Sequence, residues 1–201
     1  MLVKIIIDAA IFVFPAFMAN ASPTILGKGK RFNTPIDGGR LWRDNKRILG
    51  DGKTVRGFIS GVISGMIICV AIILIAKQLN YPLTFLSMLK SGIAYSVAHP
   101  LGAILFSNEI ILGSLVGFTL GSGALIGDLI GSFIKRRSGL KRGESFFFMD
   151  QLGFLITAML FTYLIIPWPI IWFVLLIPLT LVLHISLNLV SYSIGLQEAP
   201  L

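Results

Sequence analysis

The sequence predicts an all-α membrane protein with five transmembrane helices, two basic cytoplasmic loops and one interfacial or re-entrant segment. Of its 201 residues, 55% are hydrophobic and only 13% are charged, whereas a soluble domain carries about 25% charged residues. Apolar runs long enough for a bilayer recur along the chain, because a crossing helix needs about 20 apolar residues. A soluble enzyme, a disordered chain and a fibrous repeat are therefore excluded. The single cysteine excludes an internal disulfide and a CxxC metal site.

The apolar runs define the crossings of a single polytopic domain over residues 1–201. Residues 57–76 carry no charge, and the run ending at 131 contains one acid, Asp128. Between 151 and 197 there is no charged residue, and Pro167-Trp168-Pro169 divides that run, with the tryptophan expected as an interface anchor. We expect crossings near 2–20, 57–76, 110–131, 150–166 and 170–192.

Clustered positive charge predicts the orientation. Fourteen of the 17 lysines and arginines fall in two stretches, nine between 28 and 56 and five between 135 and 142. Short basic loops stay in the cytoplasm. We therefore expect loops 21–56 and 132–149 and the C-terminus in the cytoplasm and the N-terminus outside. A signal peptide cleaved after Ala21 is the alternative for the first crossing, but it would place the first basic loop outside.

The segment 82–107 is apolar but contains Lys90, His99 and Pro100. If it crossed the membrane, the two basic loops would lie on opposite sides. We therefore expect an interfacial or re-entrant element on the outer side.

Glycines recur every four residues in two of the expected crossings. One crossing carries Gly57, Gly61 and Gly65; the other carries Gly113, Gly117 and Gly121, followed by Gly123, Gly127 and Gly131. Small residues at this spacing let helices approach closely in lipid. Helix packing is the simpler interpretation, and space for a ligand beside a charged residue is the alternative.

Asp128 is the strongest single indication of chemistry, because an ionisable residue in a membrane helix usually faces a partner or a polar cavity. At helical spacing, Ser132 and Lys135 share its face. Asp150 opens the next helix after a basic loop. Two carboxylates flanking a basic loop predict a Mg²⁺ site, since this ion favours one or two carboxylates together with phosphate oxygens and water. A helix-end acid in contact with water is the alternative for Asp128.

Both basic loops suit a polyphosphate. Beside paired acids, the cations over 135–142 would neutralise the same oxygens as the metal. In the first loop, the run 33–37 offers hydrogen-bonding side chains on a stiff turn, as recognition of a base or ribose would require. The run 50–54 is not a P-loop, because the motif needs glycine where Arg47 stands. For the cations over 135–142, the alternative is a topology signal without ligand binding. For the first loop, the alternative is a solvated turn.

The sequence assembles no Ser-His-Asp triad, HExxH motif or cysteine nucleophile, and both histidines, His99 and His184, lie away from the basic loops. A reaction that needs no protein nucleophile fits better. Phosphoryl or nucleotidyl transfer to a phosphate group is of that kind, because the acceptor is already anionic and the protein has to position it and neutralise charge.

The run from Ser132 through Lys135, Arg136 and Lys141 to Asp150 resembles the signature of the CTP:phosphatidate cytidylyltransferase family. Gly127-Asp128-Leu129 and Lys53-Thr54-x-Arg56-Gly57 also resemble that family, and the blocks NTPID and RILGDGKT resemble its archaeal branch of CDP-archaeol synthases. The resemblance covers essentially the whole chain. Departures include Arg142 and Gly153, which stand where the family has aspartates. The number of metal ions at the site, one or two, therefore stays open.

The resemblance implies a reaction in which CTP and 2,3-bis-(geranylgeranyl)glycerol 1-phosphate give a CDP-activated ether lipid and pyrophosphate. It implies Mg²⁺ as the cofactor, and CTP and an isoprenoid ether-lipid phosphate, without nucleic acid, as the partners. By motif match, Asp128 and Asp150 would hold the metal, with Lys135 as a further catalytic residue. The residues expected at the nucleotide are Asn33, Asp37, Lys53, Thr54, Ser132, Arg136 and Lys141.

Two other classes remain as rivals. A CDP-alcohol phosphotransferase would carry a DxxDGxxAR motif, which is absent. A small transporter or channel for an anionic substrate would be expected to show repeated halves, and no such symmetry is visible here.

Overall fold

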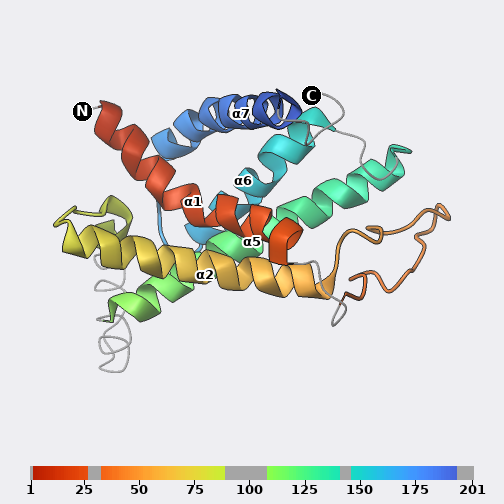
Figure 1. Ribbon diagram of the computed structural model, residues 1–201, viewed down its shortest axis with the longest axis horizontal. Coiled ribbons are helices and arrows are strands. Elements are labelled where there is room, and N and C mark those ends of the chain that lie inside the picture. The colour runs from red at the N-terminus through yellow and green to blue at the C-terminus, as the bar shows by residue number, and fades with distance from the viewer. Residues whose placement is uncertain (1, 27–32, 89–107, 141–145, 194–201) are drawn as a thin grey trace.

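The computed structural model describes residues 2–26, 33–88, 108–140 and 146–193 (Figure 1). Its named helices are α1 (Leu2–Leu26), α2 (Val55–Gln78), α5 (Glu109–Arg137), α6 (Phe147–Tyr163) and α7 (Ile170–Ser193). In the described part of the chain there is no β-strand, and only two isolated bridges lie outside the helices. The all-helical class is thus confirmed.

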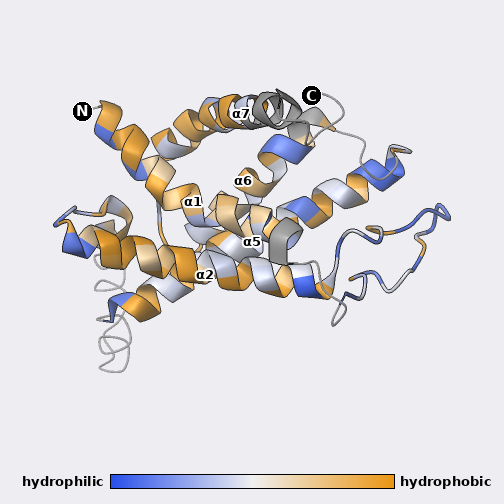
Figure 2. Cartoon of the chain, in the orientation of Figure 1, coloured by the Kyte–Doolittle hydropathy of each residue, from blue (hydrophilic) through white to orange (hydrophobic). Residues whose placement is uncertain are grey.

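Three described helices are long and apolar enough to cross a membrane, over Leu2–Pro23, Val55–Gln78 and Glu109–Arg137. Apolar residues dominate their middles and polar residues gather at their ends (Figure 2). α6 has 17 residues, and the apolar stretch of α7, Ile170–Leu183, is shorter still. The last two crossings therefore stay a prediction.

Local chemistry explains where the helices begin and end. Thr54 caps α2 by accepting a hydrogen bond from the Gly57 amide at 3.1 Å, and Asn108 caps α5 in the same way through Ile110 at 2.9 Å. α5 stops before Gly139, whose φ of +78° favours glycine.

α5 is longer than the predicted crossing over 110–131, so the expected loop 132–149 is wrong in its first residues, 132–137. These residues are helical because no glycine or proline interrupts them. The three cations of the last turn also favour the negative end of the helix dipole. The first loop is likewise shorter than expected at its start, since α1 continues to Leu26.

α5 lies at the centre and packs against α1, α2 and α6 through its glycines. A Cβ atom on Gly117 would lie 2.6 Å from the Cα of Met66 in α2, and one on Gly123 would lie 2.7 Å from the Cα of Ala158 in α6. The two glycine rows therefore serve two different neighbours. The helix-packing interpretation is confirmed for these contacts.

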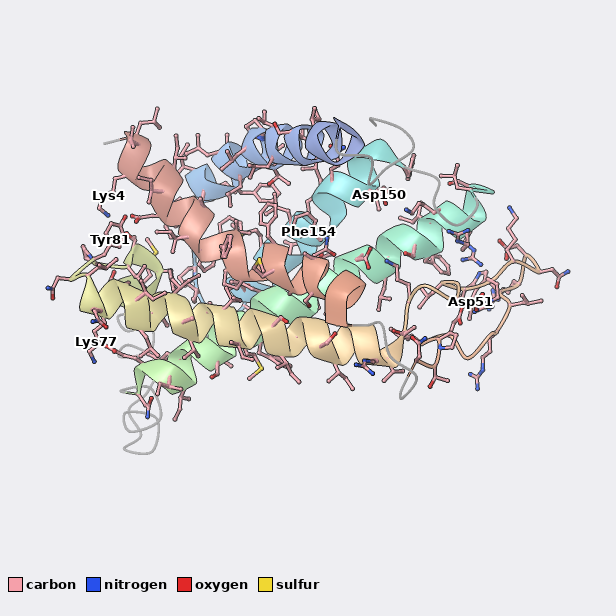
Figure 3. The ribbon with its side chains drawn as sticks, viewed as in Figure 1. Lys4, Asp51, Lys77, Tyr81, Asp150 and Phe154 are labelled. Carbon is pink, nitrogen blue, oxygen red and sulfur yellow. The ribbon has the colours of Figure 1, made fainter. Side chains whose placement is uncertain are left out.

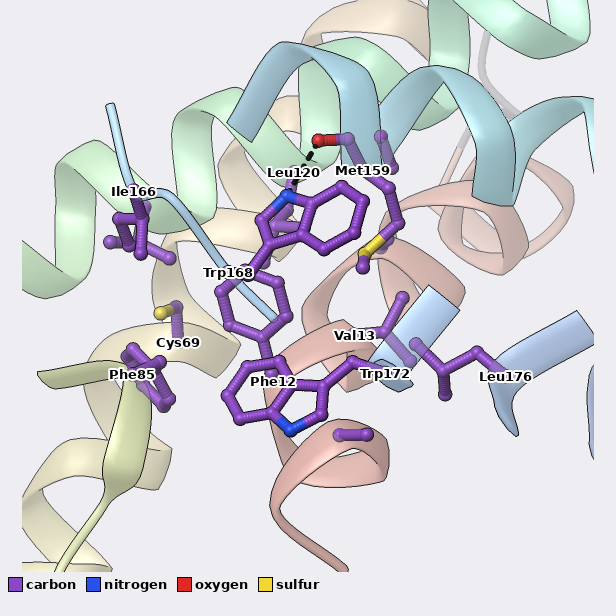
Figure 4. Close-up of a cluster of buried hydrophobic side chains, with 14 of the residues drawn as sticks. Phe12, Val13, Cys69, Phe85, Leu120, Met159, Ile166, Trp168, Trp172 and Leu176 are labelled. Atoms are coloured by element: carbon purple, nitrogen blue, oxygen red, sulfur yellow. Dashed lines mark hydrogen bonds between the residues drawn. The ribbon is translucent and has the colours of Figure 1, made fainter. Parts of the chain in front are cut away.

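Aromatic side chains from α1, α7 and the segment after α2 fill one end of the core (Figure 4). The Phe12 ring lies 5.1 Å from Trp172 and 5.5 Å from Phe85. Trp168 was expected at the membrane interface, but it is buried, and its indole nitrogen donates to the Met159 carbonyl at 3.0 Å. The expectation was wrong because the turn between α6 and α7 folds the ring back into the protein.

The two basic segments lie at the same end of the helices, where Arg137 of α5 bonds the backbone of Arg47 at 3.0 Å. At the other end, Lys77 of α2 pairs with Glu109 of α5 at 3.1 Å. The chain after α2 thus leaves and returns at one end, in agreement with the parity argument for the segment 82–107. Residues 89–107 of that segment lie outside the described residues, and which end faces the cytoplasm stays a prediction.

Candidate active site

A folded loop over residues 33–54 covers the end of α2 and α5, and the buried carboxylate of Asp37 organises it. Asp37 accepts hydrogen bonds from Arg47 at 2.9 Å and from the amides of Leu49, Gly50 and Gly39 at 2.9, 3.0 and 3.1 Å. One side chain therefore ties both halves of the loop together.

Backbone hydrogen bonds close the base of the same loop. The Ile36 amide donates to the Lys53 carbonyl at 2.8 Å, and the Val55 amide donates to the Thr34 carbonyl at 3.0 Å. Lys53 thereby reaches the start of α2 in a fixed position, although the loop contains no regular strand.

The charges of the loop follow from these contacts. Burial opposes ionisation of Asp37, but the Arg47 guanidinium and the three backbone amides outweigh it and hold the pKa of this carboxyl well below its usual range. The hydrogen bonds that Arg47 donates to Asp37 and to Asp51 raise the pKa of Arg47. Asp37 is therefore ionised at neutral pH.

A cavity of about 870 Å³ lies between this loop and the ends of α1, α2 and α5. The loop contributes mainly polar residues, and the helices contribute the apolar side chains of Phe58, Leu125 and Leu129 together with the polar side chains of Asn20 and Asp128. Such a volume lies in the usual range for small-molecule sites. The residues that line the cavity include Asn33, Lys53, Thr54, Phe58, Leu125, Asp128 and Leu129.

Asp128 of α5 is paired with Lys53 of the loop across this cavity. The side chains are 34% and 28% exposed, so both can be reached from the cavity. The pair joins the membrane helix to the loop at the cavity.

A second acid–ammonium pair joins α5 to α6. Lys135 donates to Asp150 at 2.7 Å, and the other oxygen of Asp150 accepts the Phe146 amide at 2.9 Å. Asp150 lies at the same end of the molecule as Asp51 of the loop (Figure 3). Asp128 and Lys135, which the sequence placed on one face of α5, therefore pair with different elements: Asp128 with the loop and Lys135 with α6.

Arg136 lies beside the loop, since a Cβ atom on Gly50 would lie 4.0 Å from its Nε. One terminal nitrogen donates to the Leu140 carbonyl at 2.6 Å. Its Nε is buried and has no hydrogen-bond partner among the described residues. A buried donor without an acceptor is costly, so this group suits an anionic oxygen of a ligand.

The structure brings part of the predicted set together. Asn33, Lys53, Thr54 and Asp128 line one cavity. Asp37 does not line it, because its oxygens are bound within the loop, and the hydroxyl of Thr54 accepts the helix-capping bond described above. Ser132 is buried on α5, and neither it nor the Lys135–Asp150 pair belongs to the lining. Lys141 lies outside the described residues.

The sequence analysis missed several lining residues. Asn20 and Pro23 of α1 and Asp51 of the loop contribute to the cavity. An asparagine near the end of an apolar run and the acid inside the Gly-Asp-Gly turn were signals that could have found two of them. Proline within a membrane helix gives no comparable signal.

Of the two acids expected at Mg²⁺, Asp128 lines the cavity and Asp150 does not. In the described residues, no group of three or more histidine, cysteine or acidic side chains gathers into a metal cage. Asp128 and Asp150 each hold an ammonium group, so their surroundings favour a cation. Mg²⁺ usually takes one or two carboxylates together with phosphate oxygens and water; Asp128 offers one such ligand at the cavity, and binding of the ion stays a prediction.

The family model "CarS-like: CDP-archaeol synthase" matches residues 2–105 and 84–201. The CDP-archaeol synthase of Thermococcus gammatolerans is 40% identical over 94% of this chain and 92% of its own length. That of Pyrococcus horikoshii is 38% identical over 97% and 96%.

A solved structure is also similar. It is described as "Structural insight into an intramembrane enzyme for archaeal membrane lipids biosynthesis". The match has a TM-score of 0.65 and 31% sequence identity, and it covers 92% of this chain and 94% of that chain. The resemblance to the archaeal branch found in the sequence is thereby confirmed.

Proposed function

The chain belongs to the CDP-archaeol synthase family and is a membrane-bound, CTP-dependent lipid cytidylyltransferase, and we propose that it acts on 2,3-bis-(geranylgeranyl)glycerol 1-phosphate with Mg²⁺. The observation that carries the proposal is the two-sided cavity between the 33–54 loop and the helices. Its polar lining residues suit a nucleoside triphosphate, and the apolar side chains that the helices contribute suit a lipid.

The polar side supplies charge for the triphosphate. Lys53 lines the cavity. Arg136 does not line it, but beside the loop it holds a buried donor that has no acceptor among the described residues. Lys135 lies on the same helix as both Asp128 and Arg136. Positively charged donors of this kind bind phosphate oxygens strongly. Asn33, at the cavity wall, is positioned to hydrogen-bond the base or ribose.

The apolar side consists of Phe58 of α2 and of Leu125 and Leu129 of α5. These residues lie where the membrane helices meet the loop. An isoprenoid glycerol phosphate can place its chains in the bilayer and its phosphate beside Asp128. A CTP molecule held by the loop then meets the lipid phosphate at the boundary.

The reaction needs positioning more than it needs a protein nucleophile. An oxygen of the lipid phosphate attacks the α-phosphorus of CTP, the bond from that phosphorus to the bridging oxygen breaks, and pyrophosphate leaves. A phosphate monoester has a second pKa of about 6, so the attacking oxygen is already deprotonated. The lysines and Arg136 stabilise the charge on the departing pyrophosphate.

Asp128 and Asp150 would hold Mg²⁺. When bound, the ion neutralises phosphate charge as a Lewis acid. Lys53 and Lys135 balance the two carboxylates in this structure, and each ammonium group lies on an element that also borders the nucleotide. The basic end is expected to face the cytoplasm, where CTP is available.

Product formation by the purified protein tests the proposal. CTP, Mg²⁺ and the unsaturated ether-lipid phosphate should give a CDP-lipid and pyrophosphate in equal amounts, whereas ATP or omission of the lipid should give neither. Removal of divalent ions should stop turnover, and Mg²⁺ should restore it. Pyrophosphate release without lipid would contradict the transfer, and full turnover in a chelator would contradict the metal.

A further inference from the structure

The last residue of α5, Arg137, binds the middle of the 33–54 loop. Its Nε donates to Asp44 at 3.2 Å, and its terminal nitrogens donate to Asp44 and to the carbonyls of Lys46, Arg47 and Ile48 at 3.0 to 3.3 Å. A further bond joins it to a carbonyl within α5. One guanidinium group thus connects the helix to four residues of the loop.

Other contacts reinforce this connection. Lys46 donates back to the Arg137 carbonyl at 3.2 Å. The Arg137 guanidinium lies 4.1 Å from the centre of the Phe133 ring, and Trp42 of the loop packs edge-on against the same ring at 5.4 Å. The hydrogen bond from Arg137 lowers the pKa of Asp44, so this partner stays charged at neutral pH. Polar and aromatic contacts together fix the loop to the helix.

Arg137 and its neighbour Arg136 differ in how their donors are used. A guanidinium has five N–H donors, and Arg137 makes six hydrogen bonds to protein oxygens. Its donors are therefore committed. Arg136, by contrast, keeps a buried Nε without an acceptor among the described residues. Adjacent arginines are thus prepared for different partners, one for the protein and one for an anion.

We propose that Arg137 is a positioning residue for nucleotide binding: it fixes the 33–54 loop to α5 and so holds Asn33 and Lys53 at the cavity opposite Asp128. The inference rests on the proposed function, because it assumes that the cavity binds CTP. α5 carries both Asp128 and Arg137, and the loop carries Lys53. The anchor therefore sets the distance between the two walls of the site, without contact between Arg137 and the substrate.

Steady-state kinetics with both substrates test this role. R137A should raise the KM for CTP about tenfold, because several hydrogen bonds that order the loop are lost, while kcat changes less. The KM for the lipid should stay within about twofold, since Phe58, Leu125 and Leu129 belong to helices. R137K, which keeps the charge but loses the forked geometry, should lie between R137A and the wild type.

R43A is the matched control, because it removes one exposed cation from the same loop and leaves every Arg137 contact in place. An unchanged KM for CTP in R137A, or an equal increase in R43A, would overturn the inference. A uniform loss of kcat without a change in either KM would also overturn it, because that result indicates less folded enzyme.

Hydrogen–deuterium exchange separates the anchor from the enzymatic assignment. Amides over residues 42–48 should exchange faster in R137A than in R43A, whether or not the protein turns over CTP. If R137A does not fold, D44N removes the charge of Asp44 and one of the two oxygens that accept from Arg137, without changing α5, and should also show faster exchange. Equal exchange would overturn the anchor. An inactive wild type with intact loop protection would contradict the proposed function instead.

Discussion

Asp128 and Asp150 each have one ammonium partner on a neighbouring element, so each acid neutralises a lysine of the site. D128N and D150N keep the size of the side chain but lose its charge. We expect each to lower kcat at least about 100-fold, because a neutral amide is a poor magnesium ligand. Turnover of purified, folded variants measures the effect.

E109Q provides the control for these two variants. Glu109 lies on α5 as well, at the end far from the loop, where it pairs with Lys77. Its replacement should leave kcat within about twofold of the wild type. Near-normal turnover in D128N and D150N would contradict the metal assignment.

Asp37 makes the loop sensitive to acid. Its pKa is lowered in the folded loop, so the carboxylate stabilises the fold above its unfolded pKa of about 4, and that contribution disappears as the pH falls toward the folded value. D37N should destabilise the loop by about 1–3 kcal/mol at pH 7. The difference between D37N and the wild type should shrink below about pH 4.

Hydrogen exchange of the Leu49 and Gly50 amides, compared between the two proteins at matched pH, measures that difference. A difference in exchange between D37N and the wild type that stays constant from pH 7 to pH 3 would contradict the assigned role of the Asp37 carboxylate.

The two glycine faces of α5 set how closely it approaches α2 and α6. An added methyl group at Gly117 or Gly123 would meet backbone atoms at 2.5 to 2.8 Å, whereas one at Gly131 would meet its nearest atom at 3.8 Å. G117A and G123A should therefore lower the free energy of unfolding by about 1–3 kcal/mol. Thermal unfolding in detergent checks this expectation.

G131A is the matched control on the same helix. It should be neutral or slightly stabilising, because alanine favours a helix over glycine by about 1 kcal/mol. Equal destabilisation by G131A and G117A would show that the close approach is not the cause.

The positions of the helices could be predicted more fully than the structure of the site. Apolar runs indicate where α2 and α5 lie, because this signal is local in the sequence. The helical spacing of Asp128, Ser132 and Lys135 already implied helix beyond 131, but the end of α5 at Arg137 was not predicted, because a loop was expected from 132. Trp168 was misplaced because hydropathy does not distinguish lipid from the protein interior.

The site depends on contacts between distant segments, and these leave weaker signals. Asp128, as an acid in an apolar run, was visible in the sequence, but its pairing with Lys53 was not. Asp37 was expected at the nucleotide, whereas the structure uses it inside the loop. Arg137 was overlooked because a cation in a basic run gives no indication of the partner it binds.

At the scale of the whole molecule, the contacts between Arg137 and the loop place both basic segments at one end. Cysteine labelling tests which side that end faces. In a C69A background, R43C marks the basic end, and L79C marks the other end, where Leu79 is 70% exposed. A membrane-impermeant maleimide should label L79C in intact cells and R43C only in inside-out vesicles.

Cys69 itself is buried between helices, so the C69A background removes a residual signal and little else. Labelling of R43C in intact cells would contradict the expected orientation and would place the nucleotide site on the wrong side for CTP.

The claim that joins all these observations is that CTP binds between the 33–54 loop and α5. Photoaffinity labelling with a photoreactive CTP analogue, followed by peptide mapping, tests it most directly. The account predicts labelled peptides from 33–54 and from the end of α5 that contains Asp128, with the label competed away by CTP but not by ATP. Label confined to α7 or to the end near Lys77 and Glu109 would contradict it.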